Sequence, residues 1–240
     1  SRHILLPEME YEGQEKLLAS HVLIIGAGGL GSSTSIYLAS SGIGKLTICD
    51  FDRVELSNLQ RQILHSDAAI GMNKAKSAKY FLEKLNPNIN VEAIEEKLDI
   101  DSMKRIARGA DVIIDCSDNF YTRYALNQIA FDLKKPLVSG AAIKFEGQLS
   151  VFDLTSEVSP CYECLFPDAK EEQELRCADH GVFSPLVGMI GTAQAAETIK
   201  ILLSIGSPLV GKLATLDIKT MRWQTFIVKK DPLCKVCGTH

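Results

Sequence analysis

The chain has 240 residues, of which 46% are hydrophobic and 23% charged, and its formal net charge is −4 at pH 7. These values are typical of a soluble globular protein with one sizeable domain. They argue against a nucleic-acid-binding protein, because the balance of charge is not basic and no arginine-rich stripe is present.

Apolar runs alternate with helical segments through the first 140 residues. Strands separated by helices imply a parallel, doubly wound sheet. Small residues at Ser32, Ser33 and Ser35 allow the first of these helices to pack tightly, and Ser41-Gly42 ends it. The strands are expected at Val22–Ile25, Leu46–Cys49, Val91–Ile94, Val112–Cys116 and Leu137–Gly140, and the helices at Gly29–Ser40, Asn73–Asn86, Ile100–Arg108 and Tyr121–Leu133.

After Gly140 the pattern becomes that of antiparallel strands. Apolar and polar residues alternate at Gly147–Asp153, Lys212–Ile218 and Arg222–Val228. The segment Pro167–Asp179 is charged and polar without an apolar period, which predicts a mobile loop. We therefore expect an α/β fold in which a Rossmann-like parallel sheet continues as antiparallel strands.

The most apolar helical stretch, Pro185–Leu203, contains Glu197 and Lys200. Two ionisable groups argue against a membrane span, so we interpret this stretch as a closely packed internal helix. Cys49 and Cys116 end apolar strands, where a free cysteine acts as a small hydrophobe. No secretory signal is recognised either, so we expect a cytoplasmic protein with no disulfide framework and no membrane partner.

The segment Val22-Leu-Ile-Ile-Gly-Ala-Gly-Gly-Leu-Gly31 has the pattern of a buried strand, a glycine-rich turn and the start of a helix. Such a turn holds a nucleotide phosphate, because glycines allow close approach and the helix N–H groups donate hydrogen bonds. Asp50 ends the second strand, where an acidic residue commonly binds ribose hydroxyls. By itself this pattern suggests NAD or FAD.

The segment Ser57-Asn-Leu-Gln-Arg-Gln62 follows the second strand, where a dehydrogenase would proceed to its next helix. Asn58, Arg61 and Gln62 offer amide and guanidinium donors suited to phosphate oxygens. Lys74, at the start of the next predicted helix, adds a positive charge. Each residue alone has a surface role as its alternative, but together they favour ATP over NAD.

Asp118 and Asn119 follow the predicted strand Val112–Cys116, at the edge of the sheet where such folds bind ligands. A carboxylate there can hold Mg²⁺, which prefers few protein oxygens together with phosphates. The alternative is an Asp/Asn cap for the helix Tyr121–Leu133. The two roles are compatible, and we expect involvement in metal or phosphate binding.

Cys161-Tyr-Glu-Cys164 and Cys234-Lys-Val-Cys237 form two C-x₂-C pairs. Four such thiolates suit a tetrahedral structural Zn²⁺ with no open position for catalysis, provided that the fold brings the pairs together. A redox C-x-x-C is the alternative, but it normally begins a helix in a thioredoxin-like unit, whereas Pro160 precedes the first pair here.

Cys177 lies beside Arg176 in the predicted mobile loop. An electropositive, exposed setting can make a thiol reactive, and a spare, partly exposed cysteine is the alternative. The five histidines show no metal spacing, so we expect solvated or helix-packing roles for them.

The combination of GAGGLG at 26–31, Asp50-Phe-Asp52, SNLQRQ at 57–62, Lys74, Asp118-Asn119 and the two C-x₂-C pairs resembles the MoeB/ThiF/HesA adenylyltransferases. These are bacterial relatives of ubiquitin-activating enzymes, and the similarity runs from Arg2 to Gly238. The resemblance implies that Arg2 reaches the nucleotide of a partner subunit, and hence a homodimer. It also implies an ATP site made of Gly29, Asp50, Ser57, Asn58, Leu59, Gln60, Arg61, Lys74, Asp118 and Asn119.

The implied reaction is adenylation of the C-terminal glycine of a ubiquitin-like sulfur carrier, with ATP and Mg²⁺, giving an acyl-adenylate and pyrophosphate. The carboxylate is already a nucleophile, so catalysis reduces to positioning and charge neutralisation at the α-phosphate. Arg61, Lys74 and Mg²⁺ on Asp118 would supply that charge, with Arg2 from the partner. One domain, 1–240, would then comprise a nucleotide-binding half (1–140) and a zinc-bearing, carrier-binding half (141–240).

Two carriers are candidates. Asp50-Phe-Asp52, Leu64-His-Ser-Asp67 and Val138–Ile143 are more similar to MoeB, which serves the molybdopterin-synthase small subunit (MoaD-like). Cys164–Asp168 is more similar to ThiF, which serves the thiamine-pathway carrier (ThiS-like) and in which a cysteine matching Cys177 can link covalently to the carrier. We favour the MoeB-like reading. The alternatives from other classes are an NAD-dependent oxidoreductase and a zinc-stabilised scaffold without chemistry.

Overall fold

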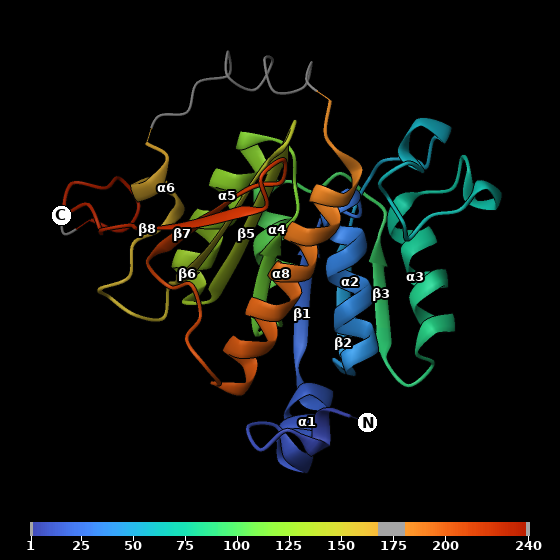
Figure 1. The fold of residues 1–240 in the computed structure, drawn as a ribbon, viewed down its shortest axis with the longest axis horizontal. Coiled ribbons are helices and arrows are strands. Elements are labelled where there is room, and N and C mark those ends of the chain that lie inside the picture. The colour runs from blue at the N-terminus through green and yellow to red at the C-terminus, as the bar shows by residue number, and fades with distance from the viewer. Residues whose placement is uncertain (1, 168–180, 239–240) are drawn as a thin grey trace.

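An eight-stranded mixed sheet crosses the molecule in the order β3-β2-β1-β4-β5-β6-β7-β8 (Figure 1). The computed structural model describes residues 2–167 and 181–238. The five strands of the N-terminal half pair in parallel and the last three are antiparallel. The strands are β1 (His21–Ile25), β2 (Lys45–Cys49), β3 (Asn90–Ile94), β4 (Val112–Asp115), β5 (Pro136–Ile143), β6 (Glu146–Asp153), β7 (Lys212–Asp217) and β8 (Arg222–Ile227).

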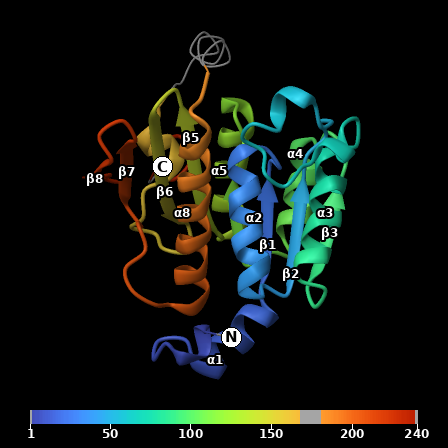
Figure 2. The same cartoon turned by 45° about the vertical axis from the view of Figure 1, so that its right-hand side comes forward.

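The predicted α/β sheet is therefore confirmed, including the change from parallel to antiparallel pairing at β5. Helices cover both faces of the parallel half, so β1, β2 and β4 are buried almost throughout (Figure 2). One face carries α2 (Gly29–Ser41), α3 (Lys74–Leu85) and α8 (Ser184–Leu203), and the other carries α4 (Ile100–Ala107), α5 (Phe120–Leu133) and the short α6 (Tyr162–Leu165).

Helices α2 and α8 pack against each other at very short range because their contact surface is made of small residues. A Cβ at Gly191 would lie 2.3 Å from the carbonyl oxygen of Leu30. The Thr34 hydroxyl donates a 2.9 Å hydrogen bond to the Gly191 carbonyl oxygen. The serines and glycines of α2 and the glycines and alanines of α8 are thus explained by the close approach of the two helices.

By length and composition, α8 qualifies as a helix able to cross a membrane, but half of its apolar window is buried inside the protein. Its two ionisable side chains are satisfied internally. The buried Glu197 accepts hydrogen bonds from Lys200 Nζ at 2.6 Å and from the Leu209 N–H at 2.7 Å. These contacts match the prediction of a closely packed internal helix.

The sequence analysis missed α1 (Glu10–Ala19), which lies at the amino ends of the parallel strands (Figure 1). Only Gly13 and Leu17 of this helix are buried, so the sequence contains too short an apolar stripe to predict it. Three short 3₁₀ turns were also missed: η1 (His3–Leu5), η2 (Leu56–Asn58) and η3 (Asp67–Ala69). The loop predicted at Pro167–Asp179, with Cys177, lies outside the described residues except for Pro167.

Candidate functional site

The glycine-rich turn lies at the carboxyl ends of β1 and β4, where α2 begins (Figure 1). Gly26 has a φ of +100°, which favours glycine. A Cβ at Gly31 would lie only 2.0 Å from the carbonyl oxygen of Gly26, so a side chain there would push the turn away from α2. At Gly28, by contrast, the only neighbour of an added Cβ within 4 Å among the described residues would be Gln62 Nε2, at 3.6 Å. Gly26 and Gly31 are thus required by packing, whereas Gly28 leaves room beside the helix N-terminus.

Two side chains hold the Ala27 peptide in the middle of this turn. The Ala27 N–H donates to Asp50 Oδ2 at 2.8 Å, and its carbonyl oxygen accepts from His65 Nε2 at 2.9 Å. The other oxygen of Asp50 accepts the N–H of Asp52 at 2.9 Å. Burial raises the pKa of Asp50, and the two N–H groups oppose that rise. Asp50 therefore shapes the turn itself, and its contact with a ribose stays a prediction.

Helix α3 begins beside this turn and carries Lys74 as its first residue. Asn73 caps the helix by accepting the Lys76 N–H at 3.1 Å, and its amide donates to the Asp50 carbonyl oxygen at 2.9 Å. Lys74 is 7% exposed, and its ammonium donates to Asp52 Oδ2 at 2.9 Å. The positive charge of Lys74 is therefore held beside Asp52, which follows the carboxyl end of β2. This agrees with the prediction that Lys74 stands at the start of a helix.

The segment Ser57–Gln62 forms the 3₁₀ turn η2 followed by an irregular stretch. Asn58 closes this turn, because its amide oxygen accepts the Glu55 N–H at 3.1 Å. Arg61 lies next to the glycine-rich turn: an added Cβ at Gly29 would be 3.5 Å from Arg61 Cγ. The Ser57 and Gln60 carbonyl oxygens accept from Arg61 and Ser184, the Leu59 N–H donates to the Leu56 carbonyl oxygen, and the Ser57 hydroxyl donates to Glu55. The structure thus brings Arg61 to the turn, while Asn58 has a structural task.

Asp118 and Asn119 connect β4 to α5. Asn119 caps α5 by accepting the Thr122 N–H at 2.8 Å, so the predicted cap is confirmed. Asp118 is exposed. This connection contacts the glycine-rich turn, since an added Cβ at Gly26 would lie 2.6 Å from the Cys116 carbonyl oxygen. The Asp118 carboxylate is thus available near the turn, and its role as a Mg²⁺ ligand stays a prediction.

Of the residues predicted for the nucleotide site, Arg2 lies away from the others in the part of the chain that the structure describes. It is exposed and immediately precedes η1, which contacts α1, and α1 lies at the end of the sheet opposite the glycine-rich turn (Figure 1). Within one chain it cannot join the site. A role for Arg2 therefore requires a second copy of the chain.

The sequence analysis missed two side chains near the site, His65 and Arg123. His65 is buried and contacts Ser77 of α3, as a helix-packing role predicts, but it also bonds the glycine-rich turn, which we did not expect. Arg123 donates to the Ser117 carbonyl oxygen at 3.0 Å, one residue before Asp118. A lone histidine in a loop and an arginine on a helix have no sequence pattern that would single them out.

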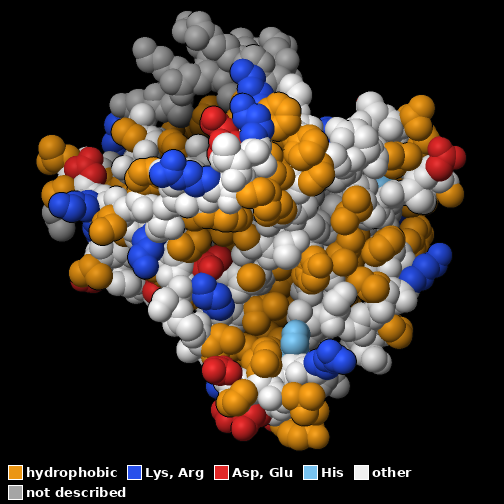
Figure 3. Space-filling view, in the orientation of Figure 1, with side chains coloured by type: hydrophobic (Ala, Val, Ile, Leu, Met, Phe, Trp, Pro, Cys, Tyr) orange, Lys and Arg blue, Asp and Glu red, His pale blue; other side chains and the backbone are white. Residues whose placement is uncertain are grey.

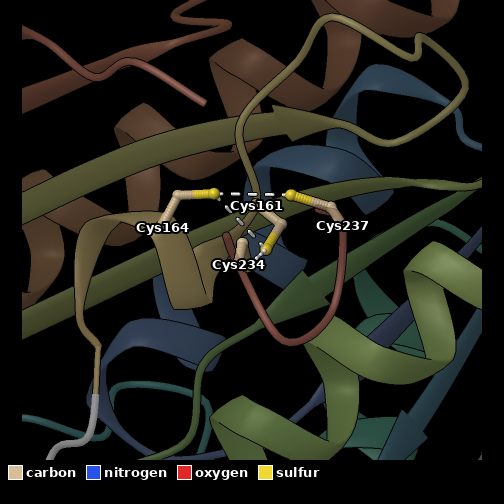
Figure 4. A group of neighbouring side chains, drawn as sticks. All are labelled: Cys161, Cys164, Cys234 and Cys237. Carbon is tan, nitrogen blue, oxygen red and sulfur yellow. Dashed lines mark hydrogen bonds between the residues drawn. The ribbon is translucent and has the colours of Figure 1, made fainter. Parts of the chain in front are cut away.

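The four cysteines of the two C-x₂-C pairs come together between α6 and the C-terminal segment (Figure 4). Their sulfurs all lie within 4.8 Å of one another. Sulfur separations are 4.0 Å for Cys161–Cys164, 3.6 Å for Cys161–Cys234 and 3.4 Å for Cys164–Cys237. Four sulfurs bound about 2.3 Å from one Zn²⁺ would lie roughly 3.8 Å apart, so the cluster fits a tetrahedral metal ion.

A model of the ThiF family matches residues 1–236 of this sequence. The chain belongs to the ThiF family. Its relatives include the molybdopterin-synthase adenylyltransferase of Salmonella typhimurium, which is 43% identical over 99% of this chain and 95% of the relative. The sulfur carrier protein adenylyltransferase of Thermus thermophilus is 42% identical over 99% of this chain and 89% of the relative.

The solved structures agree with this family assignment. The crystal structure of E. coli MccB with ATP superposes with a TM-score of 0.83 at 26% identity, covering 94% of this chain and 68% of MccB. MccB with succinimide gives a TM-score of 0.84 at the same identity. The ThiF-family relatives named above are adenylyltransferases, and the resemblance seen in the motifs is confirmed.

Proposed function

We propose that this ThiF-family chain adenylates the C-terminal glycine of a ubiquitin-like sulfur carrier, using ATP and Mg²⁺. The observation that carries the proposal is the gathering of the glycine-rich turn, Arg61, Lys74 and the Asp118 connection at one edge of the sheet. These elements combine a helix N-terminus, two cations and one exposed carboxylate. Such a set suits a nucleotide triphosphate with a metal ion.

In the proposed site, the N–H groups at Gly28 and Gly29 face the phosphates, and Asp50 binds the ribose. Lys74 and Arg61 neutralise the negative charge that develops around the α-phosphate as the carrier's carboxylate attacks. Asp118 would hold Mg²⁺, which when bound neutralises phosphate charge and orients the leaving pyrophosphate. No general base is needed, because the carboxylate attacks in its ionised form.

The carrier that we favour is a MoaD-like molybdopterin-synthase small subunit. Support comes from the Salmonella relative, whose name specifies molybdopterin synthase and which matches nearly end to end. The alternative is a ThiS-like carrier, with Cys177 forming a covalent link to it. The Thermus relative, named for a sulfur carrier protein without further specification, is compatible with either.

We propose a homodimer in which Arg2 completes the site of the partner. Supporting this, apolar side chains gather at the surface over α8 and α2 (Figure 3). Tyr37 of α2 is 52% exposed, and half-buried Met189 and Ala193 lie on α8. An apolar face of this kind is typical of a protein interface.

We further propose that the four-cysteine cluster holds Zn²⁺ in a structural role. The closed set of four thiolates would leave no coordination position for a substrate. A cytoplasmic location suits this role, because a reducing compartment keeps the four thiols available for the metal.

Pyrophosphate exchange into ATP tests the reaction and the carrier together. We expect exchange that depends on a MoaD-like carrier ending in glycine and is absent with a carrier lacking that residue. Stronger exchange with a ThiS-like carrier would favour the alternative substrate. Tight NADH binding without Mg-ATP binding would refute the adenylyltransferase proposal, and Mg-ATP binding without exchange with either carrier would favour a scaffold.

A further inference from the structure

The backbone of the first cysteine pair is attached to α5 through a buried asparagine. Asn127 Nδ2 donates to Cys161 Sγ at 3.4 Å, and Asn127 Oδ1 accepts the Tyr162 N–H at 2.9 Å. The Tyr162 ring is 2% exposed and packs edge-on against Tyr124, with 5.5 Å between ring centroids, and against Phe152, at 6.1 Å. The position of Tyr162 is thus set by the cysteine cluster and by α5 together.

Tyr162 lies near the guanidinium of Arg123, and the buried Tyr162 hydroxyl and Arg123 Nε have no hydrogen-bond partner among the described residues. Both line a small cavity of about 10 Å³ between α5, α6, β5 and β6, together with Ser139 and Ser150. The Arg123 side chain is only 14% exposed, so its charge depends on the protein groups around it rather than on solvent.

Arg123 reaches the connection that carries Asp118. Its Nη2 donates to the Ser117 carbonyl oxygen at 3.0 Å, and its Nε lies 3.9 Å from Asp115 Oδ2. Asp115 is 1% exposed and accepts both the N–H of Ser117 at 3.0 Å and its hydroxyl at 2.6 Å. The Ser117 peptide is therefore held from both sides, immediately before Asp118.

We propose that the metal-bound cysteine cluster positions Asp118 for nucleotide binding through Tyr162 and Arg123, with Arg123 as a positioning residue. The inference rests on the proposed function, because it assumes that Asp118 acts with Mg²⁺ in the nucleotide site. Cys161, Cys164, Cys234 and Cys237 would hold the metal ion, which would join the two cysteine pairs and so restrain Tyr162. Restraining Tyr162 restrains Arg123, and through Ser117 it sets where the Asp118 carboxylate lies.

The test measures the affinity of the full chain for ATP with and without Mg²⁺, by calorimetric titration. Arg123→Lys keeps the positive charge but lacks the planar fork that bonds Ser117. We expect this variant to weaken Mg-ATP binding roughly tenfold or more, the scale of a lost hydrogen bond to a charged group, while the affinity for Mg²⁺-free ATP is unchanged. Removing the bound metal with a chelator should weaken Mg-ATP binding in the same way, and should add little in the Arg123→Lys variant.

Tyr162→Phe and Tyr124→Phe form a matched pair, because both remove a hydroxyl from the same aromatic cluster and keep all four cysteines. The Tyr124 hydroxyl donates to the Phe166 carbonyl oxygen. Tyr162→Phe should reduce the Mg²⁺-dependent part of the affinity for ATP, and Tyr124→Phe should not. If metal removal unfolds the chain, this pair of variants still tests the proposal, because neither variant removes a cysteine. The proposal is overturned if metal removal or Tyr162→Phe lowers the melting temperature but leaves the Mg²⁺-dependent affinity intact. Failure of the proposed function is distinct, since the metal-loaded wild type would then not bind Mg-ATP at all.

Discussion

His65 Nε2 lies 2.9 Å from the Ala27 carbonyl oxygen, so a buried imidazole supports the glycine-rich turn. A carbonyl oxygen only accepts, and Nε2 must therefore carry the proton. The other ring nitrogen, Nδ1, lies 2.9 Å from Ser77 Oγ on α3 and accepts from that hydroxyl when the ring is neutral. One imidazole thus joins the turn to the helix that carries Lys74.

Replacing His65 should separate the donor function of the ring from its packing. His65→Leu leaves the buried Ala27 carbonyl oxygen without its donor, at a cost of about 1–3 kcal/mol in the free energy of unfolding, and should weaken ATP binding. His65→Gln retains an amide N–H and should keep most of both. Urea denaturation and ATP titration of the two variants check this. Equal ATP affinities for both variants would show that the hydrogen bond to Ala27 does not matter.

The free energy of unfolding should decrease as the pH is lowered through the range where histidines titrate. Burial lowers the pKa of His65, with the Lys74 charge adding to the effect, and burial likewise lowers the pKa of His21. The unfolded chain then binds protons that the folded chain does not, so stability decreases as pH falls from about 6.5 toward the folded-state pKa, and is constant above that range. Urea midpoints measured between about pH 7.5 and 5 should show a smaller decrease for His65→Gln than for the wild type. Parallel curves for the two proteins would contradict the assignment to His65.

Two alanine substitutions in the glycine-rich turn should have opposite consequences. Gly31→Ala places a Cβ 2.0 Å from the Gly26 carbonyl oxygen. It should lower the free energy of unfolding by roughly several kcal/mol, as severe overpacking does. Gly28→Ala meets only the Gln62 amide at ordinary contact distance, so the protein should fold normally. Because a Cβ there would lie where phosphates approach the backbone, ATP affinity should still drop. A Gly28→Ala variant with wild-type melting temperature and wild-type ATP affinity would argue against phosphate binding at this turn.

Removing either positive charge of the proposed site should reduce catalysis far more than stability. We expect Lys74→Met and Arg61→Met each to lower carrier-dependent pyrophosphate exchange about 10²–10³-fold, the scale of losing one preorganised charge donor. Lys79→Met is a suitable control, because Lys79 lies on the same helix and pairs with Glu83 at the surface, with 3.6 Å between Nζ and Oε1. Exchange in Lys74→Met that stays near that of the control would remove Lys74 from the mechanism.

Arg2 should act on the site of the other subunit. Arg2→Ala and Lys74→Met homodimers should both be nearly inactive, and mixing them under conditions of subunit exchange should restore up to about a quarter of wild-type exchange, since half of the dimers then contain one intact site. Sedimentation or mass measurements establish whether subunits have exchanged. Complete exchange with no recovered activity, or an Arg2→Ala homodimer that keeps wild-type exchange, would contradict a role for Arg2 in the partner's site.

Much of the fold follows from the sequence by itself. The alternation of buried strands with helices requires a parallel sheet, because each apolar strand must be covered on both faces. The glycine-rich turn, the start of α3 at Lys74 and the Asn119 cap depend on local backbone preferences, which act over a few residues. The two C-x₂-C pairs predicted a metal cluster because the spacing within each pair is itself a local property.

Only the tertiary structure decided which of these local features meet. The strand order β3-β2-β1-β4-β5 brings the ends of β1, β2 and β4 to one edge, and so places Lys74 and Asp118 around the glycine-rich turn. The position of His65 depends on a hydrogen bond to the carbonyl oxygen of Ala27, which is distant in the sequence. The position of Arg123 depends on the buried carboxylate of Asp115. No local sequence pattern predicts either contact. Arg2 lies at the opposite end because the chain enters the sheet at the amino end of β1. Local preferences therefore set the elements, whereas the packing of the sheet set the site.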